Sequence, residues 1–209
     1  ALRPSWIIRL GLLIYDWLGG KTSLPKSKYI NLDNDFEDNP IKSDFQNGHE
    51  YSDLFVDDAR LVLLNIRDAK NKGAKIYTNT NIIETKRYED YWEISLNNKE
   101  VLKSKVIVNA TGPHAINVLN NIFSLQSNKK LRLIQGSHIV VEKIYNGDQA
   151  YILQLKDKRV IFLIPYLNDY TLIGTTDREV NTSNKPEITN SEKRYLIDSV
   201  NSFINKKIS

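Results

Sequence analysis

The spacing of hydrophobic and polar positions separates predicted helices from predicted strands along this chain. Residues 5–18 are strongly apolar and predict a first helix, in which Pro4 suits the first turn and Gly19 and Gly20 end the run. Residues 21–50 are polar and contain two prolines, so we expect a long irregular connection there.

A second helix is predicted to open at Asp57 and Asp58, whose carboxylates favour a helix N-terminus, and to end near Gly73. Between Gly73 and Pro113, apolar and polar positions either alternate or give way to a continuously apolar run. A further helix is expected to begin at the turn with Pro113. Four short strands are expected before that turn, at residues 75–78, 82–88, 92–96 and 105–110.

Beyond about residue 131 short β-branched or aromatic runs follow one another, separated by Gly, Asn and Asp. They predict an antiparallel sheet with strands at residues 137–142, 150–155, 160–165 and 171–174. A last helix is expected over 191–205, capped by Asn190 or Ser191, and the first and last helices are expected to cover the sheet.

These elements predict an α/β (α+β) fold. We expect a helix and irregular connection in residues 1–51, a helix and strands ending in a strand–turn–helix in 52–126, and an antiparallel domain with a C-terminal helix in 127–209.

Composition narrows the possible functions. Hydrophobic residues make up 41% and charged residues 26%, a globular balance. The net charge is only +4 and the lysines gather in pairs, which favours solvated faces and no nucleic-acid partner. There is no cysteine and the three histidines lie far apart, so no metal site is expected. The chain has no methionine, so Ala1 is not expected to be a natural start.

Arg9 and Asp16 interrupt the first helix and share one face of it, being seven residues apart. One interpretation is a helix packed into a core with this stripe facing water. The other is a helix that also touches a membrane surface, because the apolar run is too short to span a bilayer.

The first candidate site is the sequence VIVNATGP at residues 106–113. An apolar strand runs into Thr111 and Gly112, and ligands often bind where such a strand meets the N-terminus of a helix. An ordinary strand–helix turn explains the same pattern, so both interpretations stay open.

The second candidate is Gly136, Ser137 and His138 at the start of a strand. A single histidine there is more often structural, although imidazole is suited to proton transfer near neutral pH. The third candidate is the end of a strand, where Gly174, Thr175, Thr176 and Asp177 form either a simple turn or an edge near a ligand.

None of the nine glycines fits the spacing G-x-G-x-x-G, which excludes a self-sufficient Rossmann dinucleotide site. P-loop, G-x-S-x-G and H-E-x-x-H motifs are absent as well.

Several segments, in this order and spacing, are similar to the respiratory FAD-dependent glycerol-3-phosphate dehydrogenases of bacteria, which belong with the D-amino-acid-oxidase-like flavin oxidoreductases. They are LRPSWIIRLGLLIYDWLGG at 2–20, YSDLFVDDARLVLLN at 51–65, VNATGP at 108–113, LRLIQGSHIVV at 131–141, AYILQ at 150–154, IFLIPY at 161–166 and TLIGTTDREV at 171–180.

The resemblance implies an FAD domain with a Rossmann-like sheet and an antiparallel sheet that caps the flavin and binds substrate. It implies that glycerol 3-phosphate gives a hydride to FAD, that His138 takes a proton or contacts substrate, and that a membrane quinone then receives the electrons. Thr111 and Gly112 would lie near the cofactor. Gly136, Ser137, Gly174, Thr175, Thr176 and Asp177 would lie in the substrate domain.

The same resemblance places the glycine-rich FAD motif and most phosphate-binding groups in flanking segments of the enzyme. Arg132, Arg159 and Arg178 do not assemble into a phosphate site by sequence alone. Where family members often have Trp and His, this chain has His114 and Trp17. The implied location is peripheral, at the inner face of the cytoplasmic membrane.

Two alternatives remain beside the enzyme. The chain by itself is expected to be inactive, as a remnant or excised fragment that folds without binding FAD. An enzyme for an amine or amino acid is the weaker alternative.

Overall fold

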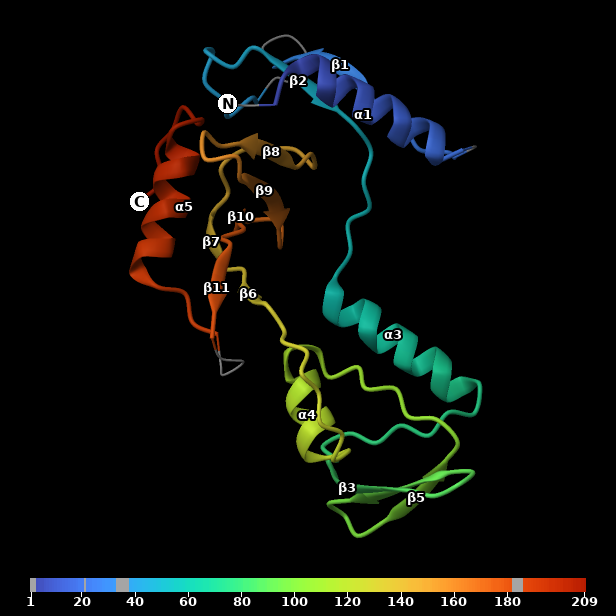
Figure 1. Ribbon diagram of the computed structural model, residues 1–209. Coiled ribbons are helices and arrows are strands. Elements are labelled where there is room, and N and C mark those ends of the chain that lie inside the picture. The colour runs from blue at the N-terminus through green and yellow to red at the C-terminus, as the bar shows by residue number, and fades with distance from the viewer. Residues whose placement is uncertain (1–2, 21, 33–37, 182–185) are drawn as a thin grey trace. The chain divides into compact units, whose positions relative to one another are not determined.

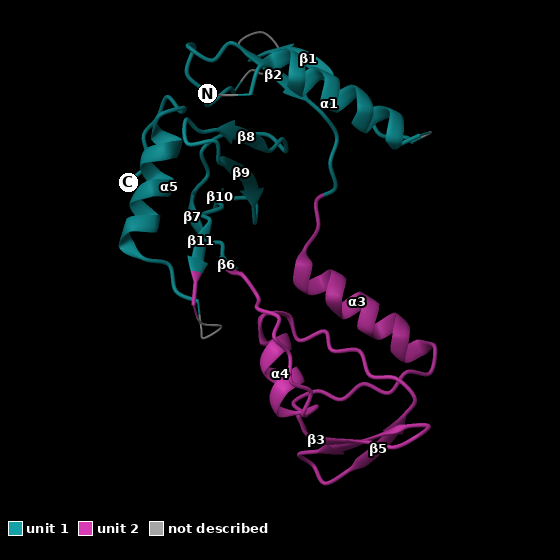
Figure 2. Ribbon diagram, viewed as in Figure 1, with its two compact units in different colours: residues 1–54, 134–179, 184–209 teal, residues 55–133, 180–183 magenta. Residues whose placement is uncertain are grey.

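The computed structural model describes residues 3–20, 22–32, 38–181 and 186–209. The chain divides into two compact units, coloured separately in Figure 2. Unit 1 comprises Ala1–Leu54, Ile134–Glu179 and Asn184–Ser209, and unit 2 comprises Phe55–Leu133 and Val180–Ser183. Helices combine with antiparallel sheets in the chain, so the predicted α/β (α+β) class is confirmed.

The centre of unit 1 is a four-stranded antiparallel sheet in the order β7-β10-β9-β8. Its strands are β7 (His138–Glu142), β8 (Tyr151–Gln154), β9 (Val160–Tyr166) and β10 (Tyr170–Gly174). Alternate side chains face a core in which Ile161, Leu163 and Ile173 are fully buried. All four predicted strands are present, because short β-branched or aromatic runs bounded by turn residues are typical of strands.

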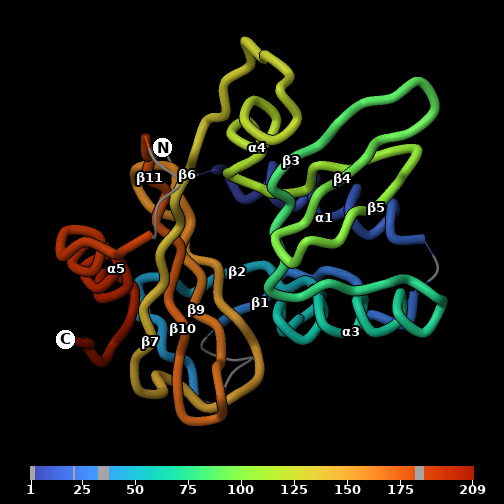
Figure 3. Tube along the Cα trace, turned by 90° about the horizontal axis from the view of Figure 1, so that it is seen from below, coloured from blue at the N-terminus to red at the C-terminus, as the bar shows by residue number. Residues whose placement is uncertain are grey.

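Helix α5 (Asn190–Asn201) covers the core face of this sheet (Figures 1 and 3). Its side chains Leu196 and Val200 are fully buried in the same hydrophobic cluster as the strands. Thr189 caps the helix, one or two residues before the predicted cap. Burial of such a stripe supplies most of a helix's stability in a folded protein.

The region predicted as an irregular connection contains a short hairpin. Strands β1 (Lys28–Asn31) and β2 (Asn47–Glu50) pair antiparallel, with Ile30 opposite Gly48. Each strand has only four residues, most of them polar, which left no periodic signal. Ile30 nevertheless joins the hydrophobic core of unit 1. Residues 33–37 of the predicted connection lie outside the described residues.

Helix α1 (Ser5–Leu18) has the predicted bounds, but its polar stripe is directed inward. Arg9 Nη1 donates to the main-chain oxygen of Ser27 at 3.1 Å, and Asp16 Oδ2 accepts from the Ser27 hydroxyl at 2.7 Å. No residue of α1 is buried, whereas Trp6 and Trp17 are 68% and 78% exposed. The first interpretation, in which Arg9 and Asp16 face water and the apolar side packs into a core, is wrong. Arg9 and Asp16 instead bind Ser27, and the apolar side is exposed. Helix α1 lies beside the β1–β2 hairpin and does not cover the sheet (Figure 1).

Unit 2 contains helix α3 (Asp58–Asn71), capped by Asp57, and a three-stranded antiparallel sheet. The sheet has the order β3-β4-β5, and the short helix α4 follows the turn after Pro113. The bounds are Ile82–Arg87 for β3, Trp92–Leu96 for β4, Val101–Ser104 for β5 and Ala115–Asn121 for α4. Ile94, Leu96 and Phe123 are its buried apolar side chains.

Two predicted strands of unit 2 are absent from the described chain. Residues 75–78 and 105–110 do not form strands, and Val108 is 82% exposed. Neither segment forms a strand, because no strand of the described residues pairs with it. A strand needs a neighbour whose main-chain groups form hydrogen bonds with its own. The apolar sequence of 105–110 still suits a strand covered on both faces.

Across the described residues, none of the helices combines the length and the apolar character that crossing a bilayer requires.

Candidate functional site

Two of the candidate stretches lie side by side at one end of the sheet in unit 1. Strands β7 and β10 pair so that His138 is opposite Gly174. Just beyond this pair the Ser137 main-chain N–H donates to Thr176 Oγ1 at 2.9 Å, and the Thr176 N–H donates to the Ser137 carbonyl at 3.1 Å. The sheet register therefore brings together two segments that are far apart in sequence.

Both glycines of these stretches permit a close approach. A β-carbon at Gly174 would lie 2.1 Å from Cδ2 of His138, and one at Gly136 would lie 2.5 Å from Thr175 Oγ1. Contacts of this length are not tolerated, so a side chain at Gly174 would have to displace the imidazole. Because neither position carries a side chain, the imidazole of His138 can lie against the main chain of Gly174, and Thr175 can lie against the main chain of Gly136.

His138 projects from the face of the sheet opposite α5. Its neighbour in β7, Ile139, packs against the core, whereas His138 itself is exposed. The row across the sheet continues through Gly174 to Phe162. An accessible imidazole that rests on the main chain of a neighbouring strand is held in place and can still reach a ligand, and imidazole can accept a proton near neutral pH.

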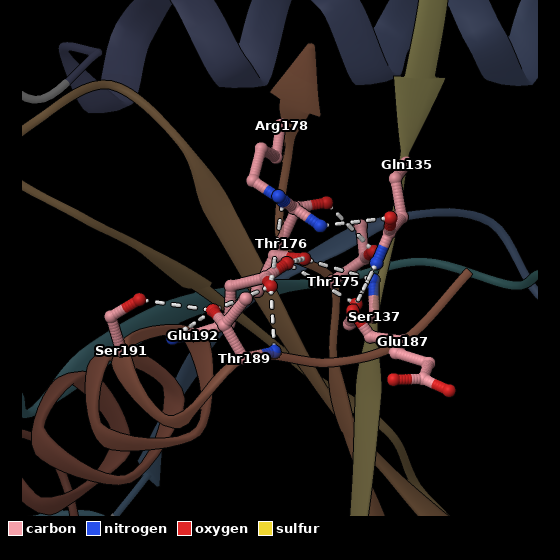
Figure 4. A network of polar contacts seen from close by, with 9 residues as sticks. All are labelled: Gln135, Ser137, Thr175, Thr176, Arg178, Glu187, Thr189, Ser191 and Glu192. Atoms are coloured by element: carbon pink, nitrogen blue, oxygen red, sulfur yellow. Dashed lines mark hydrogen bonds and ion pairs between the residues drawn. The ribbon is translucent and has the colours of Figure 1, made fainter. Parts of the chain in front are cut away.

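A buried carboxylate connects this end of the sheet with the start of α5 (Figure 4). Glu192 Oε1 accepts hydrogen bonds from Thr176 Oγ1 at 3.0 Å and Ser137 Oγ at 3.2 Å. Its Oε2 accepts from the main-chain N–H of Thr189 at 2.9 Å and from the Thr189 hydroxyl at 2.8 Å. Arg178 Nε lies 3.5 Å from the same Oε2. Oε1 thus binds hydroxyl groups at the end of the sheet, whereas Oε2 binds the cap residue of α5 and Arg178.

Burial by itself would raise the pKa of Glu192. The hydrogen bonds from Thr189 and Thr176, together with the charge of Arg178, outweigh burial and lower the pKa from 4.5 to about 2. The carboxylate is therefore ionised at neutral pH and acts only as a hydrogen-bond acceptor.

The structure thus brings together Gly136, Ser137, His138, Gly174, Thr175 and Thr176, as a substrate-side site would require. Asp177 is exposed and is not one of the residues in the Glu192 network. Sequence reasoning missed Glu192, and it weighed Arg178 only as a phosphate-binding group and not as a partner of this carboxylate. The spacing Thr189-x-x-Glu192 is a capping-box signal that could have located the carboxylate, but nothing local indicates that it also reaches the sheet.

Thr111 and Gly112 lie in unit 2, in the turn before α4. Gly112 has φ of +55°, and a β-carbon there would meet no atom within 4 Å. The Thr111 hydroxyl donates to Asn109 Oδ1 at 2.7 Å, which fixes the turn locally.

The chain belongs to the family described as FAD dependent oxidoreductase, which matches residues 16–208. Within that family it is similar to glycerol-3-phosphate dehydrogenases. It is 42% identical over its whole length to the glycerol-3-phosphate dehydrogenase of Pseudomonas tolaasii and 39% identical to the aerobic glycerol-3-phosphate dehydrogenase of Escherichia coli. It is also 40% identical, over 99% of its length, to the D-erythritol 1-phosphate dehydrogenase of Brucella abortus.

The chain spans only 41% to 42% of the length of these relatives. Two solved structures share its fold. The glycerol-3-phosphate dehydrogenase of Bacillus halodurans complexed with FAD covers 79% of this chain and 35% of its own, with a TM-score of 0.64 and 24% identity. The L-proline dehydrogenase of P. horikoshii covers 97% and 54%, with a TM-score of 0.67 and 15% identity. The resemblance to the glycerol-3-phosphate dehydrogenase family is confirmed.

The described residues do not form a complete site for FAD. The open main chain at Gly112 would permit the close approach of a ligand. The exposed apolar run through Val106 and Val108 suits a strand that needs further neighbours. No glycine-rich phosphate-binding motif occurs in the 209 residues, so the phosphates of FAD would have to be bound by other segments.

Proposed function

We propose that this chain is the substrate-side portion of an FAD-dependent dehydrogenase that oxidises sn-glycerol 3-phosphate to dihydroxyacetone phosphate. The observation that supports this proposal most strongly is the position of His138. The imidazole is accessible on one face of an antiparallel sheet and rests against Gly174. The similarity to glycerol-3-phosphate dehydrogenases over the whole chain supports the substrate class.

His138 is the proposed catalytic residue. Oxidation of a secondary alcohol removes a hydride from carbon and a proton from the hydroxyl group. FAD, when bound, supplies the acceptor for the hydride. His138 accepts the proton at a ring nitrogen or hydrogen-bonds to the hydroxyl, a role for which the neutral imidazole is suited. Thr111 and Gly112 are proposed to contact the cofactor.

The substrate phosphate is proposed to be held by groups from other segments of the enzyme. In this chain Arg159 already binds Asp157 at 2.7 Å and stacks on Tyr195, while Arg178 binds Glu192 and Gln135. Neither guanidinium is thus available as a paired donor for phosphate. A related polyol phosphate is a second candidate substrate, since one relative is a D-erythritol 1-phosphate dehydrogenase.

The electrons are proposed to pass to a membrane quinone, with the enzyme peripheral at the inner face of the cytoplasmic membrane. The exposed Trp6, Trp17 and Leu18 of α1 support contact with an apolar surface of this kind. The alternative is a non-catalytic fragment. The incomplete FAD site supports the narrower proposal that the chain by itself folds without retaining the cofactor.

Two measurements test this function. The first is the visible spectrum of the purified chain with and without added FAD, for which we expect a folded circular dichroism signal and no bound flavin. The second uses a chimaera in which this chain replaces the matching section of the Escherichia coli aerobic enzyme, with which it aligns over its whole length.

With an artificial electron acceptor, the chimaera is expected to oxidise glycerol 3-phosphate in preference to D-erythritol 1-phosphate. The opposite preference would reassign the substrate. A chimaera that carries FAD and oxidises neither phosphate would contradict the proposed function.

A further inference from the structure

The carboxylate of Glu192 makes more contacts than a helix cap requires. A capping box needs an acceptor for the N–H of the cap residue, and Glu192 Oε2 supplies it to Thr189 at 2.9 Å. The other oxygen, Oε1, has no role in the cap. It accepts both hydroxyl groups from the sheet, those of Thr176 and Ser137. These two residues are 4% and 8% exposed, so water does not readily replace the carboxylate.

The orientation of the Thr176 hydroxyl depends on this oxygen. A hydroxyl has one proton to donate and two lone pairs to accept with. Thr176 donates its proton to Glu192 and accepts from the main-chain N–H of Ser137 at 2.9 Å. Because the carboxylate can only accept, it directs the proton of Thr176 away from Ser137 and turns a lone pair toward it. Ser137 is thus fixed at its main chain and at its side chain.

His138 is the next residue, and its ring lies over Gly174 on the neighbouring strand. A small rotation of the main chain at Ser137 would therefore carry the imidazole off its support. We propose that Glu192 is a positioning residue for His138, acting through Ser137 and Thr176 rather than by touching substrate. The inference rests on the proposed function for its catalytic meaning, whereas the position of the ring can be measured without it.

The alternative is that Glu192 only caps α5, and two substitutions separate these roles. Thr189→Ala weakens the cap and leaves Oε1 with its two hydroxyl partners. Glu192→Gln does the reverse. The Thr189 N–H and Arg178 can only donate, so the amide oxygen must turn toward them and the amide NH₂ faces the sheet. Glu187→Gln is the matched control, since its side chain points away from the network (Figure 4).

The first experiment measures the position of the ring in the full 209-residue chain by nuclear magnetic resonance. The readout is the nuclear Overhauser effect between Hδ2 of the His138 imidazole and the Hα protons of Gly174. We expect it to be strong in the wild type, Thr189→Ala and Glu187→Gln, and to be weakened or lost in Glu192→Gln. Circular dichroism checks that each variant is folded. Ser137→Ala provides a second variant, which deletes one sheet-side contact, keeps the cap, and is expected to weaken the same signal.

The second experiment measures kcat and KM in the chimaera. Glu192→Gln is expected to lower kcat about 10- to 100-fold, as for a slightly misplaced catalytic group, with FAD absorbance retained and Glu187→Gln at the wild-type rate. A wild-type Overhauser effect in both Glu192→Gln and Ser137→Ala would overturn the inference, whatever the rates. Full activity of a His138→Gln chimaera would instead contradict the proposed function, and the Overhauser effect would still decide whether Glu192 positions the ring.

Discussion

The imidazole of His138 lies against the main chain of Gly174, where a β-carbon would come within 2.1 Å of ring atom Cδ2. The antiparallel register of β7 and β10 places the two residues opposite each other, so the contact is set by strand pairing. The position of the His138 ring thus depends on Gly174, which has no side chain, on the neighbouring strand.

Gly174→Ala is expected to displace His138 and lower kcat of the chimaera about 100-fold. The methyl group cannot share space with the ring, so the imidazole must turn away from the sheet. The rate of substrate-dependent reduction of a dye is the measurement. Gly11→Ala is the control, because a β-carbon there meets no atom within 4 Å. Equal activity of the two variants would show that His138 needs no such support.

The stability of the chain is expected to fall between about pH 4.5 and pH 2. The folded-state pKa of Glu192 is about 2, below its ordinary value of 4.5, through hydrogen bonds and Arg178 acting against burial. A lowered pKa contributes stability that is fully present above the unfolded value and is lost as pH falls through the folded one. The interval corresponds to a contribution of up to about 3 kcal/mol, reduced by solvent screening at the half-exposed Arg178.

Urea unfolding at several pH values checks this dependence. Glu192→Gln cannot titrate and should lose stability less steeply over the same interval. The account of Glu192 is wrong if the slopes of the wild type and the variant agree.

Thr189→Ala is expected to reduce the free energy of unfolding by about 1 kcal/mol, the usual cost of removing a helix N-cap. The Thr189 hydroxyl accepts from the Glu192 N–H at 3.2 Å and donates to its carboxylate at 2.8 Å. Thr189→Ser keeps the hydroxyl and should retain most of the stability. Thermal or urea unfolding compares them, and an equal loss in both variants would contradict the capping role.

Leu196→Ala is expected to destabilise unit 1 by about 2–5 kcal/mol, because the side chain is fully buried between α5 and the sheet and its removal leaves a cavity. Leu18→Ala is the control in the same unit, since that side chain is 71% exposed. Denaturant midpoints give the comparison. A small effect at Leu196 would mean that α5 does not cover the core as described.

The parts of the fold that depend on local pattern were predictable from the sequence. Short β-branched or aromatic runs between turn residues located the strands of the central sheet, and Pro4 and Asp57 marked the starts of α1 and α3. The strand predicted at 105–110 failed for a different reason. Its apolar residues describe an environment with strands on both sides, and no strand of the described chain pairs with it.

The candidate site was predictable only in part. Each of its turns could be recognised singly from Gly, Ser, Thr and His, but their meeting depends on the pairing of His138 with Gly174. The role of Glu192 depends on a contact across 55 residues to Ser137. Arg9 and Asp16 show the same limit, since their common face was visible and the partner Ser27 was not.

The most direct test of the central claim is anaerobic reduction of FAD in the chimaera by glycerol 3-phosphate, followed by the loss of flavin absorbance. We predict rapid bleaching with the wild-type chain. In His138→Gln, FAD should remain bound while bleaching slows about 100- to 10,000-fold, the usual contribution of a general base. His49→Gln, which changes a histidine in β2, should bleach at the wild-type rate. Unchanged bleaching in His138→Gln, with FAD bound, would contradict the assignment of this sheet face as the site of substrate oxidation.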